Sequence, residues 1–334
     1  MRSPAMFPRS DPPARPEGLA WLGAALLVLA LTGCASPGIL GSSGAARDET
    51  AVLVDRMMAA DIVLLGELHD QPHHHRQRLL WLKKLAEHRS IAIVMEQFDA
   101  RSQPALDRAR ADASGVSLSE RAQRVAEAAG FDFKGWEWRF YGPVVELAID
   151  RQLPLLAGNL ARDEAMRIAM GQPHPLDGPP PRGWSEQAEA SLARAIDDGH
   201  CGVLPQRMIG PMVRAQRARD AQLAEVILAA RAAGRLPVLL AGNEHLRRDH
   251  GVPIHLVSRA PDLRIFSVAL IEQETEAPAA AFDAVWRAAP VERPDPCGPL
   301  RERFGKGASA DRVARDPQSG ATGPAAPLSG VRQP

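Results

Sequence analysis

The sequence predicts an α/β fold with three layers, in which helices cover both faces of a mostly parallel sheet, together with a helical insertion. Two observations predict this fold. Several short apolar runs lack the alternation of apolar and polar residues, which is typical of strands covered on both faces. Longer stretches with apolar residues at helical spacing separate these runs, and strands that alternate with helices form parallel βαβ units.

The apolar runs give five expected strands. In chain order they are residues 62–65, 91–95, 153–157, 237–241 and 263–271. The first run is bounded by Asp61 and Gly66, and all five are short enough to be strands rather than helices.

Helices are expected before, between and after these strands. They cover residues 50–60, 72–89, 102–130 with an interruption at Gly115, 143–151, a stretch after Arg162, 184–198 and 206–233. Pro72 and Pro143 indicate helix starts, because a proline at the first helical position loses no hydrogen bond. Gly130 is typical of a helix end, and residues 171–183, rich in Gly and Pro, predict a loop.

The first 33 residues have the pattern of a lipoprotein signal peptide. Arginines precede an apolar run from Leu19 to Leu31, which is short for a membrane span. The residues Leu31-Thr32-Gly33-Cys34 resemble a bacterial lipobox, so we expect Cys34 to carry the lipid, palmitate included. Ala35 stands where an inner-membrane retention aspartate is expected, which favours the outer membrane. The alternative is an ordinary signal peptide with an incidental cysteine.

The rest of the chain divides by composition into three parts. Residues 34–50 are rich in Ser, Gly and Ala and predict a flexible tether, and residues 51–305 form one α/β domain. Residues 306–334 contain too few apolar side chains to order themselves, so they predict a disordered tail.

Cysteine content and charge narrow the biochemical setting. Cys201 and Cys297 are the two cysteines that remain in the mature chain, and in an oxidising compartment such a pair indicates a disulfide. Lys+Arg and Asp+Glu both total 40, so no excess charge attracts nucleic acid. No glycine-rich nucleotide loop is present. The expected partner is a small molecule or another protein.

Carboxylates and imidazoles follow the ends of three expected strands. Glu67 and His69 follow the first strand, Glu96 follows the second, and His245 follows the fourth. Ligands of open α/β sheets bind at the carboxyl ends of the strands, so we expect these side chains to converge on a site. His69, His73 and Glu67 would suit a transition metal by ligand type.

These residues allow an enzymatic alternative. A metal-dependent hydrolase, similar to an esterase or a protease, would use Glu67, His69, Glu96 and His245 as metal ligands or as acid and base. No serine stands in a Gly-x-Ser-x-Gly elbow, so covalent catalysis is not expected and no catalytic residue is assigned.

Tyr141 suggests a different ligand. It is the one tyrosine of the chain, it lies in an aromatic cluster with Trp136, and tyrosinate is among the few protein ligands of ferric haem. The alternative is a core tyrosine whose hydroxyl is hydrogen bonded. Arg247 and Arg248 carry guanidinium groups that suit carboxylates such as haem propionates, or they form a solvated helix start.

A series of motifs then points to a known family. They are Leu65-Gly66-Glu67-Leu68-His69-Asp70-Gln71-Pro72-His73-His74-His75, Tyr141-Gly142-Pro143, Ala157-Gly158-Asn159, His200-Cys201-Gly202, residues 215–220, residues 242–249 and Asp295-Pro296-Cys297. In this order they resemble the ChaN-like lipoproteins of the haem-binding-uptake, Tiki and TraB superfamily. His74 and His75 match two adjacent histidines of that pattern, whereas His73 falls on a position that is often acidic. His250 departs from the commoner residue at its position, so it is assigned no role.

The resemblance implies a non-enzymatic protein that binds haem at the outer membrane during iron acquisition, with homodimers able to enclose haem. It implies Tyr141 as the first axial-ligand candidate, with His69, His74 or His245 as orienting or alternative ligands. The expected haem site consists of Tyr141, His69, Glu67, His74, His245, Arg247 and Arg248.

Overall fold

The computed structural model describes residues 42–112, 115–278, 280–295, 297–298 and 301–302. The signal peptide with Cys34, the first part of the tether and the tail therefore lie outside the described residues. The chain forms two compact units, Met1–Ala45 and Ala46–Pro334. Of the first unit, the structure describes only the start of one helix. The architecture below is that of the second unit, which begins at Ala46.

The six strands of the described chain form one parallel sheet. They are β1 (Ile62–Leu65), β2 (Ile91–Asp99), β3 (Leu155–Asn159), β4 (Leu236–Leu240), β5 (Ile265–Glu272) and β6 (Ala284–Ala288), in the spatial order β3-β2-β4-β1-β5-β6. Strand β4 lies between β2 and β1. Its last residue, Leu240, is paired with Leu65 of β1 on one side and with Met95 of β2 on the other. The carboxyl ends of β1 and β4 therefore lie beside Met95 of β2, and β2 continues for four residues beyond that point.

Helices account for most of the remaining described chain. They are α1 (Ser42–Ala59), α2 (Pro72–His88), α3 (Gln103–Ala111), α4 (Leu118–Ala128), α5 (Trp138–Asp150), α6 (Arg162–Ala169), α7 (Glu186–Gly199), α8 (Gln206–Ala232) and α9 (Val252–Arg259), with short 3-10 helices at Ala100–Ser102 and Asn243–Leu246. No described helix is long and apolar enough to span a membrane.

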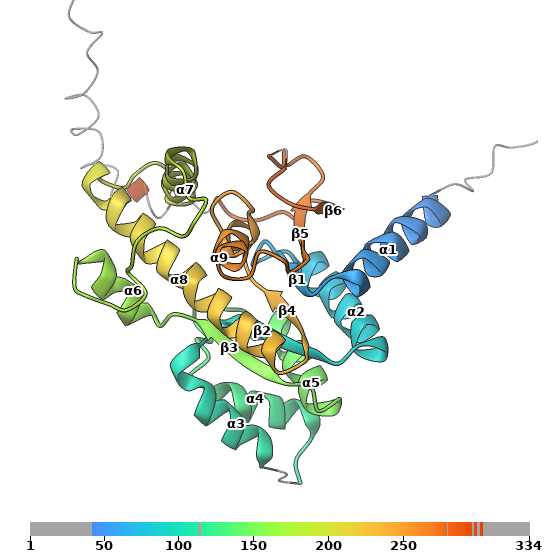
Figure 1. Cartoon of the computed structure of the whole chain (residues 1–334). Coiled ribbons are helices and arrows are strands. Elements are labelled where there is room, and N and C mark those ends of the chain that lie inside the picture. Colours follow the sequence, from blue (N-terminus) through green and yellow to red (C-terminus); the bar gives the residue numbers. More distant parts are fainter. Residues whose placement is uncertain (1–41, 113–114, 279, 296, 299–300, 303–334) are drawn as a thin grey trace, which may run out of the picture. The chain divides into compact units, whose positions relative to one another are not determined.

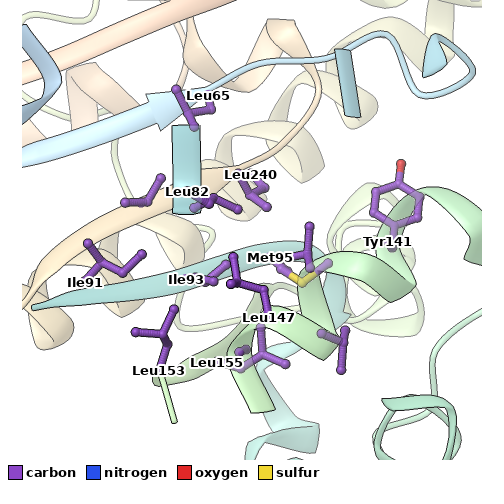
Figure 2. Close-up of a cluster of buried hydrophobic side chains, with 14 of the residues drawn as sticks. Leu65, Leu82, Ile91, Ile93, Met95, Tyr141, Leu147, Leu153, Leu155 and Leu240 are labelled. Carbon is purple, nitrogen blue, oxygen red and sulfur yellow. The ribbon is translucent and has the colours of Figure 1, made fainter. Parts of the chain in front are cut away.

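Alternate residues of the strands β1 to β5 contribute to two different apolar cores, which confirms the three-layer prediction. Val63 and Leu65 of β1 pack with side chains of α1 to α5, whereas Ile62 and Leu64 pack with α8 and α9. Figure 1 shows α8 and α9 together, apart from α3 and α4. Figure 2 shows the first core, with Tyr141 at its margin. Burial on both faces explains why the strand sequences do not alternate.

The segment between β3 and β4 corresponds to the expected helical insertion. Helices α6 and α7 pack against α8 through two small apolar clusters of their own, rather than against the sheet. Residues 171–183 form the predicted loop between them. The predicted disulfide is present: Cys201, just after α7, is bonded to Cys297, with their Cα atoms 5.6 Å apart.

Several element boundaries differ from the sequence prediction. Helix α1 begins at Ser42 rather than at residue 50, because Ala45, Ala46 and Arg47 favour a helix. Helix α5 begins at Trp138 and contains Pro143 in its interior, since burial of Phe140 and Tyr141 outweighs the lost hydrogen bond.

Other strands and helices were placed differently or not predicted. Strand β2 continues through Glu96 to Asp99, beyond the predicted end at residue 95. The sequence analysis did not predict strand β6 or helix α9. Both are short, and each is stabilised by a neighbour distant in sequence, since β6 pairs with β5 and α9 packs against α8.

Strand β3 lies at one edge of the sheet and receives a side-chain partner there. The side-chain amide of Gln103 in α3 donates to the carbonyl of Leu155 at 3.1 Å and accepts from the backbone N–H of Ala157 at 2.7 Å. One glutamine thus satisfies two backbone groups that a neighbouring strand would otherwise pair.

We expect removal of the disulfide to destabilise the domain. The Cys201–Cys297 bond joins residues 96 positions apart, and closing such a long loop is worth about 2–4 kcal/mol. The double variant Cys201→Ser/Cys297→Ser should therefore unfold at lower denaturant concentration than the wild type. A reductant should lower the wild-type midpoint to that of the variant and leave the variant unchanged. Equal midpoints for both oxidised proteins would contradict a stabilising bond.

Candidate functional site

A cleft lies where the central strands end. It has a volume of about 730 Å³. Its lining includes Glu67 and His69 after β1, Glu96 in the last part of β2, and His245 after β4. Helix α7 and the segment around Phe282 supply apolar side chains to its wall. The predicted convergence of the acid and imidazole groups at this edge of the sheet is thus present in the structure.

Glu67 is the most heavily bonded group beneath the cleft. Its Oε1 accepts hydrogen bonds from Nδ1 of His69 and from the hydroxyl of Tyr141, both at 2.6 Å. Its Oε2 forms an ion pair with Arg78 of α2, whose side chain is 1% exposed. Burial by itself raises the pKa of Glu67, but the Arg78 guanidinium and the His69 hydrogen bond outweigh it and hold that pKa below its usual range. Glu67 is therefore a carboxylate.

His69 is held by Glu67 and reaches the cleft. Its side chain is 49% exposed, and its ring contacts Trp136 edge-on at 4.7 Å between centroids. Burial by itself lowers the pKa of His69, but the hydrogen bond and charge of Glu67 raise it above the ordinary value. Among the described residues, none hydrogen-bonds to Nε2. A carboxylate on Nδ1 leaves Nε2 as the atom that can bind a metal centre, and it increases the basicity of the ring.

The histidine run that follows supports this loop. His74 Nδ1 accepts from the backbone N–H of Leu68 at 3.0 Å, and His75 Nε2 donates to the carbonyl of His69 at 2.9 Å. Burial lowers the pKa of both His74 and His75 to about 4, so both are neutral near pH 7. Arg78 donates to Nδ1 of His75 at 2.9 Å. The role of His74 in the structure is to fix the loop, and it does not line the cleft.

His245 lies between two carboxylates. Its Nδ1 is 2.5 Å from Asp220 of α8, and its Nε2 is 3.3 Å from Glu96. Burial by itself lowers the pKa of His245, but Glu96 and Asp220 raise it to about 10, so the ring is an imidazolium near pH 7. Both nitrogens face acids, so His245 has no free atom for an iron.

Two glycines allow these groups to approach one another. A Cβ on Gly66 would lie 2.0 Å from Oδ1 of Asn243, whose side chain is fixed by hydrogen bonds to both backbone groups of Leu270. A Cβ on Gly242 would lie 3.0 Å from Cε1 of His69. Glycine at both strand ends therefore keeps the loop after β4 close to the loop after β1.

Three other predicted site residues lie outside the cleft lining. Tyr141 is fully buried and donates to Glu67, and burial together with the Glu67 carboxylate raises its pKa far above the ordinary value. This is the alternative arrangement of a core tyrosine with a bonded hydroxyl. Arg247 binds Asp249 and Ser191, and Arg248 pairs with Asp283.

The metal site suggested by ligand type is not formed by the described side chains. His73 Nδ1 accepts from Arg76 at 2.7 Å instead of turning toward His69. No group of three or more His, Cys, Asp or Glu in the described part of the chain is arranged to hold a metal ion. Glu67 and His245 are committed to Arg78, Glu96 and Asp220.

Two charged residues of the site were not assigned a role from the sequence. Arg78 lies in the apolar stripe of α2 with Leu82 and Leu85, and a charge in such a stripe indicates a buried partner. Asp220 lies on the buried side of α8 with Leu223, and its charge likewise indicates a buried partner. The partners, Glu67 for Arg78 and His245 for Asp220, lie on other elements, so they depend on how the helices pack on the sheet.

Comparisons with known proteins agree with this fold and show the family. The sequence model of the family described as haem-binding uptake, Tiki superfamily, ChaN matches residues 53–256. No curated protein matches the sequence. Among solved structures, ChaN of Campylobacter jejuni with cofacial haem has 23% identity and a TM-score of 0.58, covering 68% of this chain and 87% of its own. At 23% identity, this structural similarity shows that the two proteins share a fold.

More distant structures align less well. An erythromycin esterase variant in its open conformation has a TM-score of 0.40 at 15% identity, over 70% of this chain and 77% of its own. A Bacillus cereus protein has a TM-score of 0.36 at 10% identity, over 67% and 69%. Neither of these carries an argument about function, whereas the family match covers more than half of the sequence. The chain belongs to the family described as haem-binding uptake, Tiki superfamily, ChaN.

Proposed function

We propose that this protein binds haem in the cleft at the carboxyl ends of β1, β2 and β4, and that Nε2 of His69 is the iron ligand. One observation carries the proposal: His69 is the half-exposed imidazole of the cleft whose Nδ1 is fixed by a carboxylate while its Nε2 has no partner among the described residues. Membership in the haem-binding uptake family and the haem-bound state of the C. jejuni relative support it.

The cleft suits a flat apolar ligand. Its volume of about 730 Å³ is within the usual range for small-molecule sites, and Leu68, Leu192, Ile196 and Phe282 supply apolar lining. Glu67 holds the His69 ring in orientation, and Trp136 limits its rotation. These residues bind and orient the ligand, and the proposal requires no bond to be broken. The hydrolase alternative gains no support, since its four residues are largely paired with one another or with other charged groups.

We expect His69→Ala to abolish the Soret shift that saturable hemin binding produces in the detergent-solubilised full-length protein. Tyr141→Phe keeps the packed ring and removes one hydrogen bond to Glu67. Binding should persist with a loss of about tenfold in affinity, the lower end of the loss caused by removing a supporting partner of a metal ligand. His88→Ala changes an exposed histidine of the same helix as the histidine run and serves as a control.

The opposite pattern is equally informative. A normal spectrum for His69→Ala together with a lost spectrum for Tyr141→Phe would assign the iron to a tyrosinate, as the family resemblance first suggested. Circular dichroism of each variant shows whether a lost spectrum reflects the ligand or the fold.

The proposed location is the outer membrane, with the protein anchored by lipid on Cys34. Its basis is the lipobox in the sequence. Cells that express the wild type should incorporate labelled palmitate into this protein and retain it in the outer-membrane fraction. Cys34→Ser should be unlabelled and released from that fraction. Equal labelling of both proteins would rule out Cys34 as the modified residue.

The proposed role is haem and iron acquisition, with a homodimer as the haem-bound form. Its basis is the family description and the cofacial haem arrangement of the C. jejuni relative. Analytical ultracentrifugation of the detergent-solubilised protein should show a shift from monomer to dimer as hemin is added. A monomer at saturating hemin would contradict the dimer and leave haem binding intact.

A further inference from the structure

A second cavity lies between α8, α9 and the loop of residues 171–183. It has a volume of about 220 Å³, and its polar lining consists of Arg217, Glu225, His255, Ser258 and Arg259. Among the described residues, none lines both this cavity and the cleft at the strand ends. Sites for drug-sized molecules usually have roughly 300–1,000 Å³, so this separate cavity suits a smaller ligand.

His255 of α9 is a buried polar side chain without a partner. Its exposed fraction is 5%, and no described group hydrogen-bonds to its Nε2 atom. Buried polar atoms of folded proteins nearly always have a hydrogen-bond partner, because an unpaired atom has lost its water without compensation. An enclosed, unpaired imidazole in the wall of a cavity therefore indicates a group that bonds to a ligand there.

Arg217 of α8 is a largely buried cation with weak compensation. Its side chain is 11% exposed, and its Nη1 lies 4.0 Å from the carboxylate of Glu189, which is beyond hydrogen-bond distance. Its Nη2 donates to the carbonyl of Gly178 at 3.1 Å, and its guanidinium lies over the ring of Trp184. Neither of these two partners carries a charge. Because a buried charge is costly without a close opposite charge, Arg217 favours an anion in the cavity.

A second guanidinium, that of Arg259, adds to the positive charge of this wall. Burial, followed by the charges of Arg259 and Arg217, lowers the pKa of His255 to about 4, so the ring is neutral near pH 7. A neutral imidazole carries one N–H that it can donate. Two guanidinium groups and an imidazole N–H suit the oxygens of an oxyanion, whereas the two positive charges disfavour a metal cation.

Glu225 distinguishes between oxyanions. Its carboxylate lines the cavity and lies 3.3 Å from Arg259. It repels an anion whose oxygens are all acceptors, such as sulfate. Inorganic phosphate keeps a proton near pH 7, so its P–OH group can donate to this carboxylate while its other oxygens accept from the cations. One acid among the cations therefore favours phosphate over sulfate, because specificity comes from repulsion of the wrong ligand as well as from attraction of the right one.

We propose that this cavity binds inorganic phosphate, which is held by His255, Arg217 and Arg259 and selected by Glu225. The proposal is independent of haem binding, since the cavity and the cleft have different linings. A phosphate ester presents the same oxygens, but it has lost most of its remaining proton at about pH 7.5 and lacks the donor for Glu225. Free phosphate rather than an ester is therefore the ligand.

Equilibrium dialysis of the detergent-solubilised full-length protein against radiolabelled inorganic phosphate, at about pH 7.5, tests this assignment. We expect saturable binding of one phosphate per chain and its displacement by unlabelled phosphate. Sulfate and glycerol phosphate should compete at least about tenfold less well, because neither donates a proton to Glu225 and a hydrogen bond to a charged group is worth about that factor.

Variants separate the roles of the lining residues. His255→Leu replaces the imidazole by an apolar side chain, and Arg217→Gln removes a charge, so each should weaken phosphate binding at least about tenfold. Glu225→Gln removes the repulsion and should let sulfate compete about as well as phosphate. Glu127→Gln changes an exposed carboxylate of α4 outside the cavity and should alter the binding of neither anion.

The outcomes decide the proposal without reference to hemin. Saturable binding that prefers phosphate and is weakened in His255→Leu, with the native circular dichroism retained, would establish the site. A wild type without saturable binding would overturn it, as would equal competition by sulfate and phosphate. If His255→Leu does not fold, the exposed position of Glu225 still decides, because an unchanged preference for phosphate in Glu225→Gln would also overturn the proposal.

Discussion

The buried ion pair between Glu67 and Arg78 is the interaction on which the arrangement of the cleft depends. It places a permanent carboxylate under the end of β1, and His69 and Tyr141 are both hydrogen bonded to that carboxylate. Removing one partner of a buried pair typically costs about 3–5 kcal/mol, because the other charge is left uncompensated. The position of His69 thus depends on a buried ion pair as well as on its own contacts with Glu67 and Trp136.

Two pairs of glutamate and histidine line the same cleft, Glu67 with His69 and Glu96 with His245, and their surroundings give them different properties. Glu67 pairs with one nitrogen of His69 and leaves the other without a partner among the described residues. In His245 both nitrogens are paired, one with Glu96 and the other with Asp220. The difference comes from α8, since that helix contributes Asp220. One added carboxylate therefore separates a group that can bind a ligand from one that only holds the loops together.

Much of the fold could be predicted from the sequence, because strands buried on both faces give uninterrupted apolar runs. The strand β1, the parallel sheet and the meeting of Glu67 with His245 followed from that pattern and from the rule on strand ends. Boundaries that depend on tertiary packing were not predictable in this way. Helix α5 starts before Pro143 because Phe140 and Tyr141 are buried, and this burial is set by other elements.

The candidate site was predictable in location and less so in the role of each residue. Glu67, His69 and His245 were placed correctly at the cleft, because their backbone positions follow from the strands. Tyr141, Arg247 and Arg248 were assigned from residue type and family resemblance, and the structure directs them to Glu67, Asp249 and Asp283. When a side chain pairs with a residue of another helix, strand or loop, the partner depends on the tertiary structure and cannot be predicted from the local sequence.

The glutamine beside strand β3 bears on the behaviour of the protein among its neighbours. An open strand edge is a template on which another chain can add a strand and begin to aggregate. The Gln103 amide occupies the carbonyl of Leu155 and the N–H of Ala157 in the way a further strand would. A single side chain therefore blocks the addition of a further strand at this edge of the sheet.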